Sequence, residues 1–254
     1  MGIYSRIIIE ALLKCASLVI SLELGSCLIV HYVRLLLVPA GTTRNYLCAM
    51  QLQFRIPIYM NNIPLPLILA STSPARKKLL ERLQIPFTIA PADVDETPLP
   101  NESPYNLVRR LAELKARTVA AKFPNSLIIG ADQVVVLENT LQNKPITHEN
   151  AVKQLTAASG KDVVSLTGLC LLNTQDNSMQ LDVARFDVFY RELSQETIEW
   201  YLAKDQPYQC AGSIRAEELG IVLIKETRGK DPTALPGLPL IMLVDMINEA
   251  TLSI

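Results

Sequence analysis

The chain has 254 residues, of which 49% are hydrophobic and 19% are charged, and its formal net charge at pH 7 is −1. This composition excludes an intrinsically disordered chain, because it can bury enough apolar surface to offset the entropy lost on ordering. The charge balance lacks the basic field that drives binding to duplexes, so we expect no nucleic-acid partner. Five cysteines are too few for a disulfide scaffold and indicate a reducing, cytoplasmic location.

Residues 1–59 differ in composition from the rest of the chain. They hold five of the 24 Lys and Arg residues and two of the 25 Asp and Glu residues, which leaves 19 and 23 after them and a net charge of −4. Lys14, Glu23 and Arg34 divide the apolar stretch into runs of about ten residues or fewer, whereas a membrane span needs roughly twenty. Charges at Glu10 and Lys14, inside that stretch, are atypical of a signal peptide. We therefore expect no membrane partner.

Three interpretations of this N-terminal extension remain open. Translation starts at Met60 and the preceding residues are an over-extended gene model, or the segment is an amphipathic or inserted membrane anchor, or it is a genuine additional structural element. We favour the first, with a domain over residues 60–254. Peptides from upstream of Met60 in a map of the native protein would exclude it.

After Met60 the pattern alternates between short apolar runs and amphipathic segments. Apolar runs bounded by turn residues predict strands, and apolar residues at helical spacing after Ser-Pro or Thr predict helices. In chain order we expect a strand at 65–70, a helix capped by Ser73, a strand at 87–90, a helix from 103 to about 123, a strand at 127–131 that ends at Asp132, a helix at 147–158, strands at 163–172 and 181–190, a helix at 194–203, a strand at 219–225 and a closing helix at 238–250. This alternation predicts an α/β fold with a mixed sheet flanked by helices.

The first candidate site is the turn from the first of these strands into its helix. Ser71, Thr72 and Ser73 lie where several backbone N–H groups and the helix dipole meet, an arrangement that suits phosphate. Arg76 on the first helical turn can bind phosphate oxygens in a forked way. A plain capped helix with an exposed arginine has the same pattern.

The second candidate is Asp132, at the expected end of a strand. A carboxylate there can hold a divalent cation or accept a proton from water, although a turn or capping aspartate reads the same way. The third candidate is the cluster Asp93, Asp95 and Glu96, which suits a hard cation such as Mg²⁺ but is equally typical of a solvated loop. Read singly, Lys115, Lys144 and Glu217 are ordinary surface residues.

Six motifs, in a defined order along the chain, include most of these candidate residues. They are Leu69-Ala70-Ser71-Thr72-Ser73-Pro74-Ala75-Arg76, Asp95-Glu96-Thr97-Pro98, Arg110-Leu111-Ala112-Glu113-Leu114-Lys115-Ala116, Ile129-Gly130-Ala131-Asp132-Gln133-Val134, Lys144-Pro145 and Asp231-Pro232-Thr233-Ala234-Leu235. Together they resemble the Maf-like nucleoside triphosphate pyrophosphatases over about residues 65–250. The resemblance implies a Maf/inosine-triphosphatase-like fold, with a ligand cleft between two lobes.

The resemblance also implies roles for individual residues. Asp132 would be the general base. As a separate mechanistic hypothesis, a divalent cation, Mg²⁺ or Mn²⁺, would bridge phosphate oxygens and the carboxylates of Glu96 and Asp132. The residues linked to substrate choice would be Ala75, Gln133 and Glu217. The phosphate-binding residues would be Ser71, Thr72, Ser73, Arg76, Lys115 and Lys144. Family members are often homodimers, so the resemblance also implies a homodimer.

Finer features resemble the branch that acts on 7-methyl-GTP. Gln133 directly follows Asp132, and Ala211-Gly212-Ser213 leads to Glu217. The sequence departs from the family at Asn143, Ile214 and Arg215 and has a small residue at Ala75. The alternatives are a pyrophosphatase for dTTP or UTP and a non-hydrolytic nucleotide-binding regulator of septum formation.

Overall fold

The computed structural model describes residues 32–39, 46–53 and 63–252. The chain divides into two compact units, Met1–Tyr59 and Met60–Ile254. In the first unit, strands β1 (Tyr32–Pro39) and β2 (Tyr46–Gln53) pair as an antiparallel hairpin. The expected start at Met60 lies outside the described residues. Among the helices that the structure describes, none is both long and apolar enough to span a bilayer.

The second unit alternates strands and helices in the expected order. Its strands are β3 (Leu67–Leu69), β4 (Phe87–Ile89), β5 (Leu127–Leu137), β6 (Thr140–Gln142), β7 (Asp162–Asn173), β8 (Met179–Tyr190) and β9 (Ile224–Gly229). Its α-helices are α2 (Pro74–Glu81), α3 (Pro104–Ala120), α4 (His148–Ala158), α5 (Gln195–Asp205) and α6 (Leu240–Leu252). The described part of this unit also has short 3-10 helices: η2 (Ala211–Ser213), η3 (Leu219–Leu223) and η4 (Pro232–Ala234).

Local signals explain where these helices begin. The side chains of Ser73, Ser103, Thr147 and Ser194 each accept a hydrogen bond from a backbone N–H in the first turn of α2, α3, α4 and α5. Such caps satisfy donors that have no partner within the helix. Proline follows the first two of these caps, where its missing N–H costs nothing.

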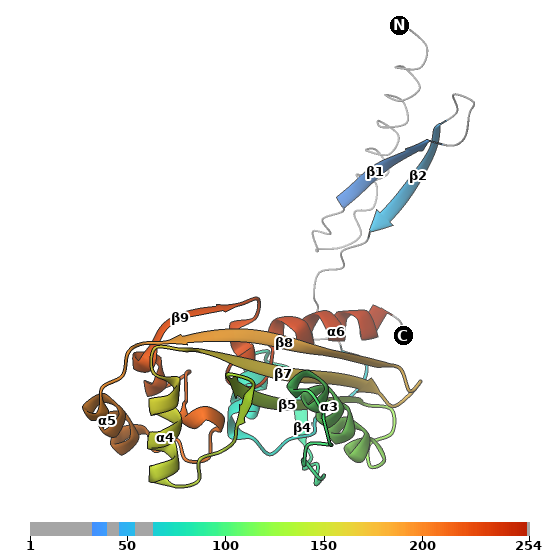
Figure 1. Ribbon diagram of the computed structural model, residues 1–254. Helices are drawn as coiled ribbons and strands as arrows, with labels where there is room; N and C mark the ends of the chain where they lie inside the picture. Colours follow the sequence, from blue (N-terminus) through green and yellow to red (C-terminus); the bar gives the residue numbers. More distant parts are fainter. Residues whose placement is uncertain (1–31, 40–45, 54–62, 253–254) are drawn as a thin grey trace, which may run out of the picture. The chain divides into compact units, whose positions relative to one another are not determined.

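The strands form one mixed sheet in the order β4-β3-β5-β7-β8-β9, with β6 paired to β5 (Figure 1). Strand β3 is parallel to β4 and β5, whereas the long strands β5, β7 and β8 are antiparallel neighbours. The α/β fold with a mixed sheet and flanking helices is therefore confirmed.

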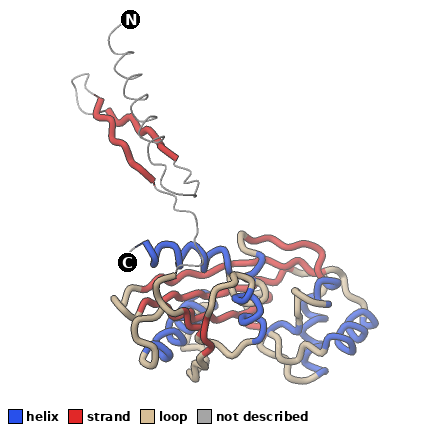
Figure 2. Tube along the Cα trace, turned by 180° about the vertical axis from the view of Figure 1, so that it is seen from behind, coloured by secondary structure: helices blue, strands red, loops and turns tan. Residues whose placement is uncertain are grey.

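Helices cover both faces of the sheet, and the hydrophobic core has three parts. Alternate residues of β3, β5 and β7 pack against α2 and α6 on one face, and the residues between them pack against α3 on the other. In Figure 1, helices α6 and α3 lie on opposite faces of the sheet. Figure 2, seen from behind, shows α6 along the same face as in Figure 1. A third cluster joins the far ends of β5, β7 and β8 to α4, α5 and η3. The unit thus has two lobes that share the long strands.

Two sequence-based expectations were wrong. Strand β5 does not end at Asp132 but continues to Leu137, because β7 pairs with it along its whole length. The expected strand at 219–225 begins only at Ile224, and residues 219–223 form η3. The backbone turns tightly there, since the N–H groups of Glu218 and Gly220 both donate to the carbonyl oxygen of Arg215.

Candidate active site

The sheet has a gap beside the middle of β5. On the side of β5 opposite β7, β3 pairs only with Leu127–Ile129, and β6 pairs only with Val135–Leu137. Residues 130–134 therefore lack a neighbouring strand on that side. Beside this gap lies a cavity of about 500 Å³, a size typical of small-molecule sites.

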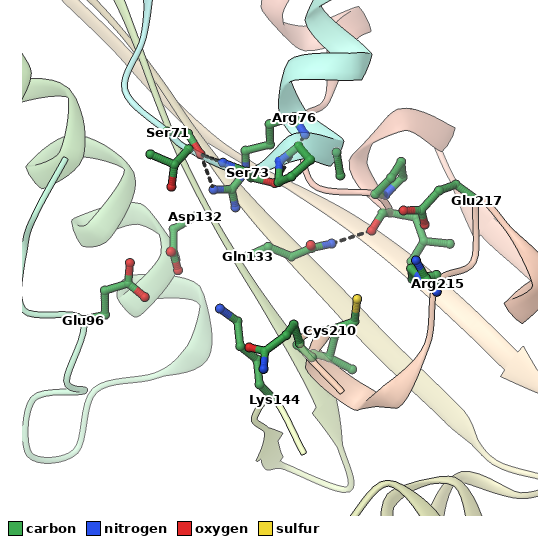
Figure 3. Close-up of a pocket in the computed structure, with 18 of the residues that line it drawn as sticks. Ser71, Ser73, Arg76, Glu96, Asp132, Gln133, Lys144, Cys210, Arg215 and Glu217 are labelled. Carbon is green, nitrogen blue, oxygen red and sulfur yellow. Dashed lines mark hydrogen bonds between the residues drawn. The ribbon is translucent and has the colours of Figure 1, made fainter. Parts of the chain in front are cut away.

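The cavity brings together all of the predicted site residues. Its lining includes Ser71, Thr72, Ser73, Ala75, Arg76, Glu96, Lys115, Asp132, Gln133, Lys144 and Glu217. In Figure 3, Asp132 and Glu96 lie on one side of the cavity, and Glu217 and Arg215 lie on the other, with Gln133 between them. Of the acidic cluster, only Glu96 lines the cavity; Asp95 instead accepts a hydrogen bond from the Thr97 N–H at 2.9 Å within its loop.

Two glycines let helix α3 approach the sheet closely. A Cβ atom on Gly130 would lie 2.1 Å from the carbonyl oxygen of Ala112, and one on Gly168 would lie 2.2 Å from that of Val108. Gly168 is also the register partner of Asp132 on β7. This close packing carries the side chain of Lys115, on the inner face of α3, directly to Asp132.

Lys115 links two carboxylates from different segments. Its Nζ donates to Asp132 Oδ1 at 2.6 Å and forms an ion pair with Glu96 Oε1, also at 2.6 Å. Asp132 and Lys115 are buried, with 6% and 7% of their surfaces exposed. Glu96, by contrast, lies on an exposed loop.

Burial and neighbouring charges shift the pKa values of Asp132 and Glu96 in opposite directions. Burial raises the pKa of Asp132, although the Lys115 ammonium and the Arg76 guanidinium oppose this. Partial burial also disfavours ionisation of Glu96, but the hydrogen bond and charge of Lys115, helped by Lys144 and Arg76, outweigh it and lower the pKa of Glu96. The raised pKa makes the Asp132 carboxylate a better proton acceptor than an ordinary aspartate.

Hydrogen bonds hold Arg76 against the turn before α2. Ser71 Oγ accepts from the Ser73 N–H at 3.2 Å and from Arg76 Nη1 at 3.3 Å. Arg76 Nε donates to the carbonyl oxygen of Gly237 at 2.8 Å, which holds the guanidinium at the cavity wall. Burial lowers the pKa of Arg76, while Asp132 and Glu96 oppose the shift. A guanidinium still keeps its charge under such conditions.

Gln133 has a structural contact that the sequence does not reveal. Its Nε2 donates to the carbonyl oxygens of Ala234 and Leu235 at 3.2 and 2.7 Å and to Ser165 Oγ at 2.9 Å. Because both carbonyl oxygens can only accept, they fix the orientation of the amide. Gln133 thus ties β5 to the turn after η4 and has its Oε1 left for a ligand.

The Asp231-Pro232-Thr233 motif builds that turn. Asp231 accepts from the N–H groups of Thr233 and Ile241 at 3.0 and 2.7 Å, and Thr233 Oγ1 accepts from the N–H of Leu240 at 2.7 Å. These bonds cap the start of α6. They also place the carbonyl groups that Arg76 and Gln133 use, so the motif supports the site indirectly.

The opposite wall of the cavity comes from the other lobe. Residues 209–211 and 214–217 line it, and Lys144 extends to it from the loop after β6. In the part of the chain that the structure describes, no hydrogen bond or ion pair engages the Glu217 carboxylate. Sequence reasoning missed Arg215 as part of this wall, although it recognised the unusual residue there.

The donor set fits a magnesium-like cation in part. The described residues contain no group of three or more His, Cys, Asp or Glu side chains that could hold a metal by themselves. Glu96 and Asp132 converge on one cation, the ammonium of Lys115, and so present two carboxylates to the same region. Mg²⁺ is usually bound by one or two carboxylates together with substrate phosphates and water, so these residues fit such an ion once a triphosphate is present.

Comparisons with known proteins bear on the family of the chain. The family model described as Maf-like protein matches residues 66–250. A 7-methyl-GTP pyrophosphatase of Nitrosococcus oceani is 53% identical over 193 residues, which cover 74% of this chain and 97% of that protein. Proteins of the same name from Methylobacillus flagellatus and Pseudomonas savastanoi are 52% and 51% identical and are covered over 95% and 98% of their lengths. The chain therefore belongs to the Maf-like protein family.

Proposed function

We propose that this protein is a nucleoside triphosphate pyrophosphatase that hydrolyses 7-methyl-GTP to 7-methyl-GMP and pyrophosphate and so clears modified nucleotides. The observation that carries the proposal is the buried Asp132 and Lys115 pair, which borders a cavity lined by Arg76 and Lys144. The name shared by the relatives supports the choice of substrate.

The cationic side chains and the turn before α2 bind the phosphates. A triphosphate carries about four negative charges at neutral pH, so its neutralisation is the largest demand on the site. Arg76, Lys115 and Lys144 supply positive charge, and the N–H groups near the start of α2 add hydrogen bonds. A divalent cation held by Glu96 and Asp132 would neutralise further phosphate charge.

Asp132 accepts a proton from the attacking water. Because its Oδ1 accepts a hydrogen bond from Lys115, we assign Oδ2 as the atom that accepts the proton from water. The water oxygen bonds to the α-phosphorus as the bond from that phosphorus to the bridging oxygen breaks, and pyrophosphate leaves with the electron pair. Lys115 orients the carboxylate, and its charge favours the deprotonated form against the effect of burial.

Glu217 accounts for the choice of base. Methylation at N7 makes guanine cationic, and the carboxylate of Glu217 can pair with its Watson–Crick edge and offset its charge. The small side chain of Ala75, which also lines the cavity, leaves room for the purine. We place the enzyme in the cytoplasm, where nucleoside triphosphates are found, and we include the homodimer in this proposal.

A substrate panel tests the proposal. Pyrophosphate release should be measured with 7-methyl-GTP, GTP, dTTP and UTP over a titration of Mg²⁺ and Mn²⁺. We expect the highest kcat/KM with 7-methyl-GTP and a requirement for one of the cations. Equal values for all four nucleotides would contradict the specificity, faster turnover of dTTP or UTP would favour a pyrimidine pyrophosphatase, and binding without hydrolysis would favour a regulator.

A further inference from the structure

A buried hydrogen-bond network ties helix α5 to the cavity wall that carries Glu217. Asp205, the last residue of α5, is only 6% exposed, and Tyr201, one turn earlier, is fully buried. The Tyr201 hydroxyl donates to Asp205 Oδ2 at 2.8 Å. Arg215 donates from Nε to the same oxygen at 3.0 Å and from Nη2 to the backbone carbonyl of Asp205.

The backbone of Arg215 is held on both sides as well. Its N–H donates to the Tyr201 hydroxyl oxygen at 3.1 Å, and its carbonyl accepts from the N–H groups of Glu218 and Gly220 at 3.1 and 3.0 Å. A Cβ atom on Gly220 would lie 2.5 Å from that carbonyl oxygen, so only glycine allows this tight turn. Glu217 lies within the turn, and its place relative to the cavity therefore depends on how Arg215 is held.

The network also balances the charge of Arg215. The guanidinium belongs to a side chain that lines the cavity, where a free positive charge would repel a cationic base. Asp205 pairs with it at 3.0 Å, and Glu218 lies 3.5 Å from Nη1. Arg76 and Lys144 also line the cavity. Arg76 donates a hydrogen bond to the Gly237 carbonyl oxygen, and both side chains border the region that we assign to the phosphates. Among the described residues of this wall, Glu217 is the carboxylate that no ion pair engages.

We propose that Tyr201 and Asp205 are positioning residues for base selection: by holding and neutralising Arg215, they set the position of Glu217 and the preference for N7-methylated, cationic guanine over neutral guanine. This inference rests on the proposed function of the site. Neither residue is among the cavity-lining residues, and both act through Arg215.

Two conservative variants test it in the full-length protein. Tyr201→Phe removes the hydroxyl and keeps the packing of the ring, and Arg215→Lys keeps the charge but loses the fork. The matched control is Arg228→Lys, because Arg228 forms an ion pair with Glu226 at 2.6 Å on an exposed part of β9. For each protein, kcat and KM for 7-methyl-GTP and GTP and the thermal unfolding midpoint should be measured.

We expect KM for 7-methyl-GTP to rise about five- to tenfold in both variants, because each loses hydrogen bonds that hold Arg215, with kcat within about twofold of the parent. KM for GTP should change little, so the preference falls, whereas Arg228→Lys should keep it. A folded variant that retains the parent preference, or that loses activity equally on both nucleotides, would overturn the network's role. If the parent hydrolyses triphosphates but has no preference for 7-methyl-GTP, this inference fails while the hydrolytic proposal stands; if it hydrolyses none, both fail.

Discussion

Lys115 lies between the carboxylates of Glu96 and Asp132. Because Asp132 is buried, its charge depends on the neighbouring Lys115 ammonium. Moving a carboxylate out of water favours its neutral form, and a cation at 2.6 Å opposes this. The protonation of Asp132 therefore reflects a balance between burial and Lys115. Any change to the lysine should appear first in the pH dependence of the reaction.

Lys115→Met should move the acid limb of the kcat/KM profile to higher pH. Lys115 lowers the pKa of Asp132, while burial and Glu96 raise it, so removing the lysine lets the pKa rise further. A protonated Asp132 cannot accept a proton, and activity is therefore lost at a higher pH than in the parent. Rates measured from pH 5 to pH 9 should display this shift.

Lys144→Met is the matched control for that measurement. Lys144 lines the same cavity but contributes to the pKa of Glu96 rather than to that of Asp132. We expect it to raise KM and to leave the acid limb near its parent position. An acid limb that stays in place in Lys115→Met would show that Asp132 is not the titrating base.

Residue types were predictable from the sequence, whereas their contacts were not. Ser73 caps α2 as its local pattern predicts, because a cap depends on residues three positions apart. Lys115 read singly is an ordinary surface lysine, because its contact with Asp132 depends on how α3 crosses the sheet. The amide contacts of Gln133 span about a hundred residues and have no local signal.

At the scale of elements, the crossing of α3 over β5 and β7 positions the site. Gly168 on β7 is the register partner of Asp132, and Gly130 on β5 lies two positions before Asp132. The absent side chains let the helix backbone lie against the sheet, which brings Lys115 within reach. Helix α3 and the sheet together hold the buried ion pair of Lys115 and Asp132 in place.

Gly168→Ala should lower both the free energy of unfolding and kcat. The added Cβ would lie 2.2 Å from the Val108 carbonyl oxygen, so the backbone of α3 must move away and carry Lys115 with it. Overpacking of this kind costs about 1–3 kcal/mol of unfolding free energy, or more where backbone is displaced. Urea unfolding would measure the loss, and kcat should fall in parallel.

Arg109→Ala, on the exposed face of the same helix, is the control for this substitution. A surface change without partners should alter the unfolding free energy by no more than about 0.5 kcal/mol. If Gly168→Ala matched this control in stability and rate, the close approach of α3 would not be what positions Lys115.

The error at the end of β5 has a long-range cause. An apolar run followed by Asp132 and Gln133 resembles a strand end, yet pairing with β7 extends β5 through both residues. Long-range pairing of this kind is absent from the local pattern. The gap beside Asp132 comes instead from the neighbouring strands, because β3 ends early and β6 pairs only near the far end of β5.

At the scale of the whole molecule, the residues of the site belong to one unit. Every residue that lines the cavity falls between Ala70 and Pro236, within the unit Met60–Ile254. The mixed sheet and its cleft between two lobes were predictable from the order of motifs, since six motifs in sequence specify a family where one does not. The proposed start of translation at Met60 stays a prediction.

The rate of Asp132→Asn in the full-length protein tests the central claim most directly. Asparagine keeps the size and one oxygen of the side chain but cannot accept the proton, so kcat for 7-methyl-GTP should fall by about 10²–10⁴-fold. Nucleotide binding, measured by calorimetry, should be retained, and Asp182→Asn on the exposed side of β8 should react at the parent rate. A rate for Asp132→Asn close to that of the parent would contradict the assignment of Asp132 as the base.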